Sequence, residues 1–134
     1  MPYTPNMKAS ARRHLEAAEQ LYRNGKRKDV AGYLYGVAAE CAVKAMMLDC
    51  GMQPRNPRNK NDPFFAHFPE LRTMLLDLKL SGRKSASISR LISHASFMQH
   101  WSTDMRYCDG REIEPDRIER WADQAGQAIS AIGT

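Results

Sequence analysis

Residues Val30 to Leu48 constrain the fold most strongly, because these nineteen consecutive positions, VAGYLYGVAAECAVKAMML, hold only two charges. Small and apolar residues recur there at spacings of three and four, as they do along one face of a helix: Leu34, Ala38, Cys41, Ala45 and Leu48. Apolar residues also fill the other faces, so the pattern predicts a central helix that partner helices cover on most sides.

The two charges, Glu40 and Lys44, argue against a membrane-spanning segment. A lysine near the middle of such a helix costs about 2.5–3.5 kcal/mol on insertion scales, so we expect a core helix and no membrane association. Glu40 precedes Lys44 by one helical turn, the orientation in which a carboxylate meets an ammonium. We favour a paired interpretation, worth a few tenths of a kcal/mol, over the alternative that both residues bind a ligand.

Turn and capping residues divide the chain into further helices. The expected helices cover residues 6–24, 30–48, 69–80, 84–98 and 115–132, with an irregular connection over 51–68. Gly25 and Gly51 are placed to end the first two helices. Asp29 can cap the second helix, and Pro115 suits the first turn of the last. The sequence therefore predicts one all-α domain, residues 1–134, folded as an up-and-down bundle of four main helices plus a short helix.

Each shorter or later helix carries an apolar stripe that we expect to face the core. The stripe residues are Leu71, Leu75 and Leu78; then Ile88, Leu91, Ile92 and Ala95; and finally Ile118, Trp121, Ala125, Ile129 and Ile132. Within the central helix, Gly32 and Gly36 each cost about 1 kcal/mol relative to alanine. They mark either a tight crossing inside the bundle, which we favour, or a dimer seam.

Positive charge is concentrated near the start of the chain. The formal net charge is +5, and the first 28 residues hold seven basic side chains against two acidic ones. Such asymmetry favours a polyanionic partner such as RNA, or an acidic protein; a solvated face without a ligand is the alternative. The candidate RNA or phosphate contacts are Arg12, Arg13, Lys26, Arg27 and Lys28.

Sequence motifs for familiar chemistry are absent. No glycine-rich phosphate loop occurs, and Cys41, Cys50 and Cys108 lack the spacing of zinc ligands, so we expect no metal and no cofactor. Cys41 and Cys50 are interpreted as buried apolar residues. No signal-like apolar segment follows Met1, and a cytoplasmic location is therefore expected.

Titratable, aromatic and cationic residues gather in the segment SHASFMQHWSTDMRY. Histidine can transfer protons near neutral pH and arginine can clamp a phosphate, so His94 or His100 with Arg106 would suit a metal-free ribonuclease-like site. The alternative is structural: half-buried histidines, with Trp101 and Tyr107 as packing residues.

Four parts of the chain together resemble the HEPN domain, a helical module often encoded beside a small nucleotidyltransferase in prokaryotes. They are AGYLYGVAAECAVKAMML, HFPEL, the WSTDMRY segment and the final amphipathic helix, in that order, over residues 9–132. The resemblance implies a four- or five-helix bundle that forms a homodimer, and it raises the expectation that Gly32 and Gly36 serve a close helix contact. It also implies a nucleotidyltransferase as a candidate partner.

The resemblance favours binding over catalysis. Active HEPN ribonucleases carry an arginine followed by a histidine after roughly four to six residues, whereas no histidine follows Arg106 here. The expected function is thus a nucleotide- or RNA-binding or regulatory module, with Arg106, Tyr107, Glu40 and Lys44 as ligand-binding residues. The alternative is a metal-independent, toxin-like endoribonuclease that uses Arg106 with His100 or His94.

Overall fold

The computed structural model describes residues 3–55 and 61–134, and these residues form helices and connecting segments without a strand. Three helices are long: α1 (Met7–Asn24), α2 (Lys28–Asp49) and α5 (Pro115–Ala131). Two are short, α3 (Glu70–Asp77) and α4 (Ala86–Ser93). Single turns of 3-10 helix are η1 (Pro63–Phe65), η2 (Arg83–Ser85), η3 (Thr103–Tyr107) and η4 (Gly110–Glu112). The all-α bundle is confirmed, with three long and two short α-helices where four main helices and one short one were expected.

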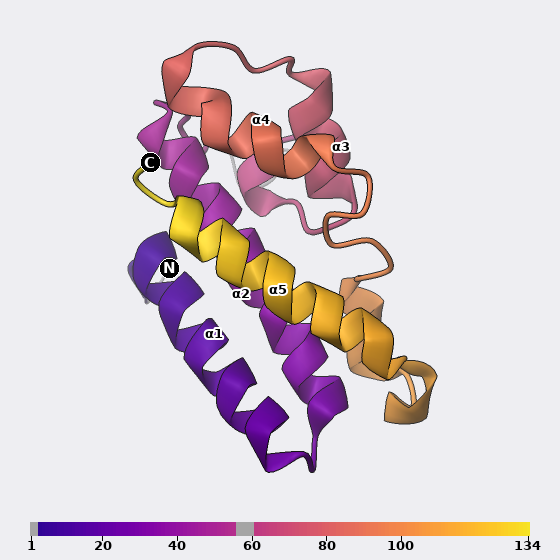
Figure 1. The fold of residues 1–134 in the computed structure, drawn as a ribbon. Helices are drawn as coiled ribbons and strands as arrows, with labels where there is room; N and C mark the ends of the chain where they lie inside the picture. The colour runs from indigo at the N-terminus through magenta and orange to yellow at the C-terminus, as the bar shows by residue number, and fades with distance from the viewer. Residues whose placement is uncertain (1–2, 56–60) are drawn as a thin grey trace.

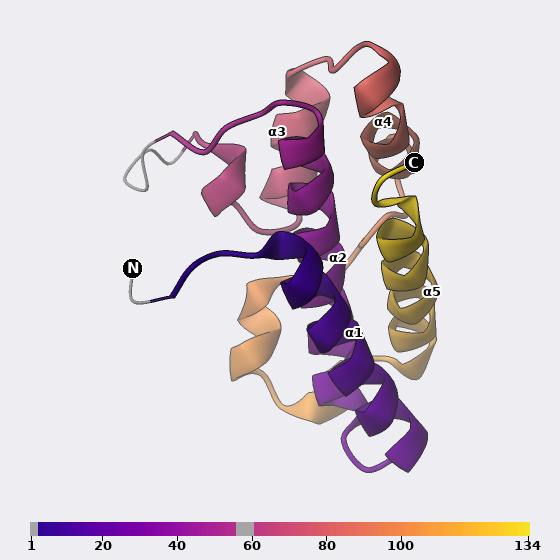
Figure 2. The same ribbon diagram turned by 90° about the vertical axis from the view of Figure 1, so that its left-hand side faces the viewer.

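Helix α2 is the centre of the molecule, as the apolar stretch predicted. Helix α1 runs back along it in the opposite direction, and α5 packs on both (Figure 1). Helices α3 and α4 cover the carboxyl-terminal half of α2. Turning the molecule shows α5 on one side of α2, with η3 and the N-terminal segment on the other (Figure 2). None of the helices within the described ranges is both long and apolar enough to cross a membrane.

Capping residues explain why the long helices begin and end where they do. The Asn6 side chain accepts a hydrogen bond from the Ala9 amide at 3.0 Å and thereby opens α1. Gly25 ends α1 in the left-handed conformation, with a φ of 72°. Gly51, with a φ of 91°, follows α2, and the Met52 amide donates back to the Met47 carbonyl at 3.1 Å. These expected ends of α1 and α2 are confirmed.

Three expectations about the helices were wrong. Asp29 does not cap α2, because the helix begins at Lys28, two residues earlier than expected, and Asp29 lies in its first turn. Helix α4 ends at Ser93, five residues before the expected end, and Ala95 is exposed. Leu78 lies beyond the end of α3 and is exposed as well, so it does not join Leu71 and Leu75 in the core.

The glycines of α2 are covered from within the chain. A Cβ atom on Gly36 would lie 1.9 Å from Cε2 of Trp101, and one on Gly32 would lie 3.1 Å from Cγ1 of Ile118. The intramolecular crossing is therefore confirmed, and a dimer seam formed by these two glycines is excluded because Trp101 and α5 already occupy their surface. Trp101 is 2% exposed, which confirms its packing role.

Candidate functional site

Basic residues from two distant parts of the sequence meet at one end of the bundle. An open hollow of about 480 Å³ lies between the α1–α2 turn and η4, next to the start of α5. Its charged lining residues are Lys26, Arg27, Lys28, Asp29, Asp109 and Arg111. Four cations thus face two carboxylates, and the hollow keeps an excess of positive charge. We call the four cations, Lys26, Arg27, Lys28 and Arg111, the basic end.

The turn that carries three of these cations follows directly from local sequence. Gly25 ends α1, and α2 begins at Lys28, so Lys26 and Arg27 are exposed on a tight connection. The Arg27 guanidinium pairs with Asp29, whose carboxylate lies near the positive end of the α2 dipole. The Lys28 ammonium lies 5.0 Å from the centre of the Tyr22 ring.

Gly110 permits η4 to approach this turn. A Cβ atom at Gly110 would lie 2.2 Å from Oδ2 of Asp29, so a side chain there would collide with the Asp29 carboxylate, and either that side chain or η4 would have to move. Next to it, Nη2 of Arg111 donates to Oδ2 of Asp109 at 2.8 Å. Hydrogen bonds from the Arg111 side chain and amide lower the pKa of Asp109, so this carboxylate stays charged. The sequence did not indicate Arg111, because no sequence pattern predicts that η4 contacts the α1–α2 turn.

Arg106 and Tyr107 end η3, and a short connection leads from there to Asp109. The Arg106 guanidinium lies 5.1 Å from the centre of the Tyr107 ring, and its Nε donates to the Thr103 carbonyl at 3.0 Å. Tyr107 is 78% exposed, so the alternative that it is a packing residue is wrong. An exposed ring offers a surface on which a base can stack, and the guanidinium beside it can donate hydrogen bonds to a phosphate.

The basic residues expected on the first helix do not form one surface. Arg12 and Arg13 are exposed near the start of α1, whereas Lys26 to Lys28 follow its end. At 1.5 Å per residue, the two groups lie about 20 Å apart along the helix. The structure brings Lys26, Arg27 and Lys28 near η4, and it places Arg13 at a different hollow.

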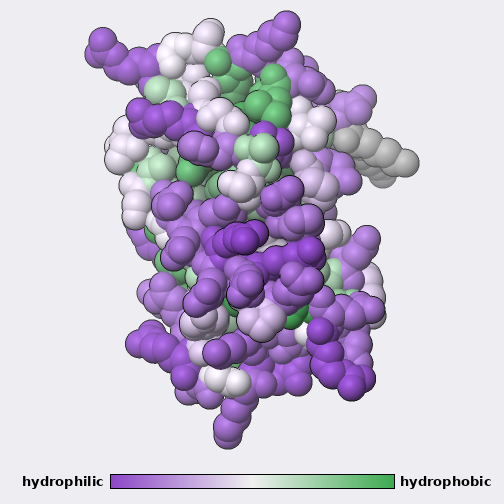
Figure 3. All heavy atoms as spheres, turned by 45° about the vertical axis from the view of Figure 1, so that its right-hand side comes forward, coloured by the Kyte–Doolittle hydropathy of each residue, from purple (hydrophilic) through white to green (hydrophobic). Residues whose placement is uncertain are grey.

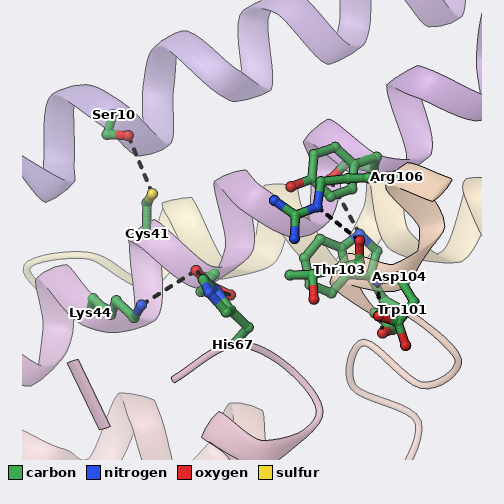
Figure 4. A network of polar contacts seen from close by, with 11 residues as sticks. Ser10, Cys41, Lys44, His67, Trp101, Thr103, Asp104 and Arg106 are labelled. Atoms are coloured by element: carbon green, nitrogen blue, oxygen red, sulfur yellow. Dashed lines mark hydrogen bonds and ion pairs between the residues drawn. The ribbon is translucent and has the colours of Figure 1, made fainter. Parts of the chain in front are cut away.

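Glu40 and Lys44 form the expected pair, but they are buried. Lys44 Nζ donates to Oε2 of Glu40 at 3.3 Å, and the two residues are 5% and 7% exposed, respectively. Nδ1 of His67 lies 3.1 Å from each carboxylate oxygen of Glu40 (Figure 4). Sequence reasoning missed His67, because it lies 27 positions from Glu40 in an irregular connection.

The histidines of the alternative catalytic site lie in separate places. His94 follows α4 and lines a hollow with Arg120 and Asp123 of α5. His100 lines another hollow, with Glu112 and Arg117. Arg106 contacts Thr103 and Tyr107 on η3. Neither of these two hollows brings both histidines and Arg106 together.

All three cysteine thiols have raised pKa values. Cys41, Cys50 and Cys108 are partly exposed, so the first two are less buried than expected. Burial raises the pKa of the Cys41 thiol, although a hydrogen bond with Ser10 opposes the shift (Figure 4). Burial also raises the pKa values of Cys50 and Cys108. No group of histidines, cysteines and carboxylates within residues 3–55 and 61–134 has the arrangement of a metal site.

Comparison with known proteins gave no match for the chain among protein-family models, curated proteins or solved structures. The site must therefore be interpreted from its own geometry.

Proposed function

We propose that this chain is a cytoplasmic RNA- or nucleotide-binding module, HEPN-like in kind, that acts as a homodimer. The convergence of the α1–α2 turn with η4 carries the proposal, because it gathers Lys26, Lys28 and Arg111 around one hollow with net positive charge. Arg106 and Tyr107 precede η4 by a short connection, and they would add a guanidinium beside an exposed ring. Phosphates would bind the basic end, and an unpaired base would stack on Tyr107.

Single-stranded RNA suits this surface better than a duplex. The surface is short, and it offers a flat aromatic ring that a base can reach once it is unstacked from its neighbours. Because phosphate contacts dominate, affinity should fall with salt by a slope of about 0.7 logarithmic units per neutralised phosphate. A partner protein such as a nucleotidyltransferase would work alongside this binding module.

The test measures the anisotropy of a short, labelled single-stranded RNA at about 50 and about 200 mM salt. Lys26→Gln/Lys28→Gln should weaken binding and reduce the salt slope by about 1.4, since two phosphate contacts are removed. Tyr107→Ala should weaken binding with little change of slope, because stacking is not ionic. Light scattering of the same sample should give a particle twice the 15.2 kDa of one chain.

The matched control is Arg83→Gln/Lys84→Gln, which removes the same charge from exposed positions on η2, at the opposite end of the bundle. If this control weakened RNA binding as much as Lys26→Gln/Lys28→Gln does, RNA affinity would depend on net charge alone. The proposed site would then be rejected. Metal-free cleavage of the RNA that is lost in both Arg106→Ala and His100→Ala would replace the binding module with the ribonuclease alternative. A 15.2 kDa particle at all concentrations would exclude the dimer.

A further inference from the structure

A larger hollow lies elsewhere on the molecule, where the N-terminal segment, α1, α2 and the chain around η1 meet. Its volume is about 700 Å³, within the range of roughly 300–1,000 Å³ that is typical of small-molecule sites. Its lining includes none of the basic end. We call it the α1–α2 pocket.

A buried cation lies in the wall of this pocket. Lys44 lines the pocket although it is only 5% exposed. Its ammonium has three N–H donors, and within the part of the chain that the structure describes its hydrogen-bond partner is Glu40 alone. Burying a charged pair costs several kcal/mol per ion unless every donor is used. The remaining donors of Lys44 can therefore hold an anionic oxygen inside the pocket.

Arg13 provides a second cation at the same pocket. It is exposed on α1 and lines the pocket, and no hydrogen bond or ion pair engages its guanidinium among the described residues. With Lys44 and Arg13 facing the single carboxylate of Glu40, the pocket has an excess of one positive charge. This balance fits a ligand with one anionic group.

Apolar side chains make up the outer part of the pocket. Leu48 and Phe65 are 42% and 43% exposed, and Tyr3 is more exposed still. These apolar side chains are exposed to water, and a ligand that covers them would gain about 25 cal/mol of binding free energy per Å² of apolar surface. An aromatic or acyl group would cover them, while its anionic end reaches Arg13 and Lys44.

We propose that the α1–α2 pocket binds a small amphipathic anion, with an acyl or aromatic body against Leu48 and Phe65 and one carboxylate or sulfonate on Arg13 and Lys44. This site is separate from the RNA surface, and its occupation does not depend on the proposed function.

The probe is anilinonaphthalene sulfonate, an aromatic anion whose fluorescence rises in apolar surroundings. The folded protein should bind it saturably, and octanoate should displace it whereas octylammonium should not. Arg13→Gln should weaken binding about tenfold, the loss of roughly one charge-assisted hydrogen bond. Ala9→Trp should abolish binding, because Ala9 is an exposed lining residue and the indole would fill the pocket.

Ala17→Trp is the matched control, since Ala17 is an exposed alanine of the same helix that does not line the pocket. It should bind the probe like the parent protein, as should Lys26→Gln/Lys28→Gln. Probe fluorescence that persists in both Ala9→Trp and Arg13→Gln would overturn the proposal, as would equal displacement by octanoate and octylammonium. Circular dichroism checks that each variant is folded. If Ala9→Trp does not fold, Arg13→Gln still tests the proposal, because it changes a side chain on the surface.

Discussion

Gly36 has no room for a side chain because the indole of Trp101 lies against its Cα. The indole also stacks on Tyr33, with ring centres 5.6 Å apart, and its Nε1 donates to the Tyr33 carbonyl at 3.2 Å. One turn of α2 therefore holds the irregular segment that leads into η3. The sequence indicated that Gly36 serves a close contact, but not that Trp101 makes it. Trp101 stands outside any periodic stripe, between His100 and Ser102, so no pattern revealed its burial.

We expect Gly36→Ala to destabilise the fold although alanine favours a helix by about 1 kcal/mol. The new Cβ would collide with the indole, and overpacking of this kind costs about 1–3 kcal/mol. Gly126→Ala is the matched comparison, because Gly126 lies within α5 and its Cβ would meet nothing within 4 Å. It should stabilise the protein by about 0.5–1 kcal/mol. Urea unfolding of both variants provides the measurement, and a stabilised Gly36→Ala would contradict the packing shown here.

At the scale of elements, boundaries set by local chemistry were predicted well. Asn6, Gly25 and Gly51 act within a few residues of their own positions, so the sequence alone locates these helix ends. Pro115 likewise occupies the first turn of α5. Boundaries set by tertiary contacts were predicted poorly. The end of α4 is the clearest case, because the partner that fixes the following segment belongs to another helix.

Gln124 of α5 holds that segment through two hydrogen bonds. Its Oε1 accepts from the Met98 amide at 2.8 Å, and its Nε2 donates to the Ser96 carbonyl at 2.8 Å. Met98 and His100 both have positive φ angles, 54° and 70°, which side chains other than glycine adopt at a cost. The contacts from α5 offset this backbone cost. Neither the hydrogen bonds nor the strained angles can be inferred from residues 84–98 alone.

Gln124→Ala should therefore destabilise the protein by about 1–3 kcal/mol, the value of two backbone hydrogen bonds. Gln124→Glu should fall between alanine and the parent, because a carboxylate can still accept from the Met98 amide but cannot donate to Ser96. Gln127→Ala, an exposed change on the same helix, should have little effect. Thermal unfolding of the three variants would contradict the prediction if Gln124→Ala and Gln127→Ala behaved alike.

At the scale of the whole molecule, the candidate site was predicted in part. Lys26, Arg27 and Lys28 were found from charge alone, because a basic tract needs no tertiary information. Their neighbour Arg111 was missed, since its approach depends on Gly110 fitting against Asp29. Polar residues cover most of the face in Figure 3, and the apolar residues that reach it gather near the end that carries α3 and α4. The basic end lies at the opposite end of the bundle (Figure 1).

Two tyrosines pack where α1 meets α2, and because of them we expect the free energy of unfolding to fall at alkaline pH. Tyr35 of α2 is buried, and its ring meets that of Tyr22 of α1 edge to face, with centres 6.2 Å apart. Burial, followed by the nearby Glu19, raises the pKa of Tyr35 above its ordinary value of 10.0. Burial, followed by Glu119, raises the pKa of Tyr22 in the same way.

A raised pKa in the folded state fixes the sign of the pH effect. Well below pH 10 both phenols stay protonated whether the chain is folded or unfolded, so they contribute no pH dependence there. As pH rises through about 10 the unfolded chain releases its phenolic protons first, and the free energy of unfolding falls. Urea unfolding at pH 8 to 11 should show this decline, and Tyr35→Phe should make it shallower because one of the two phenols is gone. An equally steep decline in Tyr35→Phe would mean that other groups cause it, and that Tyr35 ionises as freely in the bundle as in the unfolded chain.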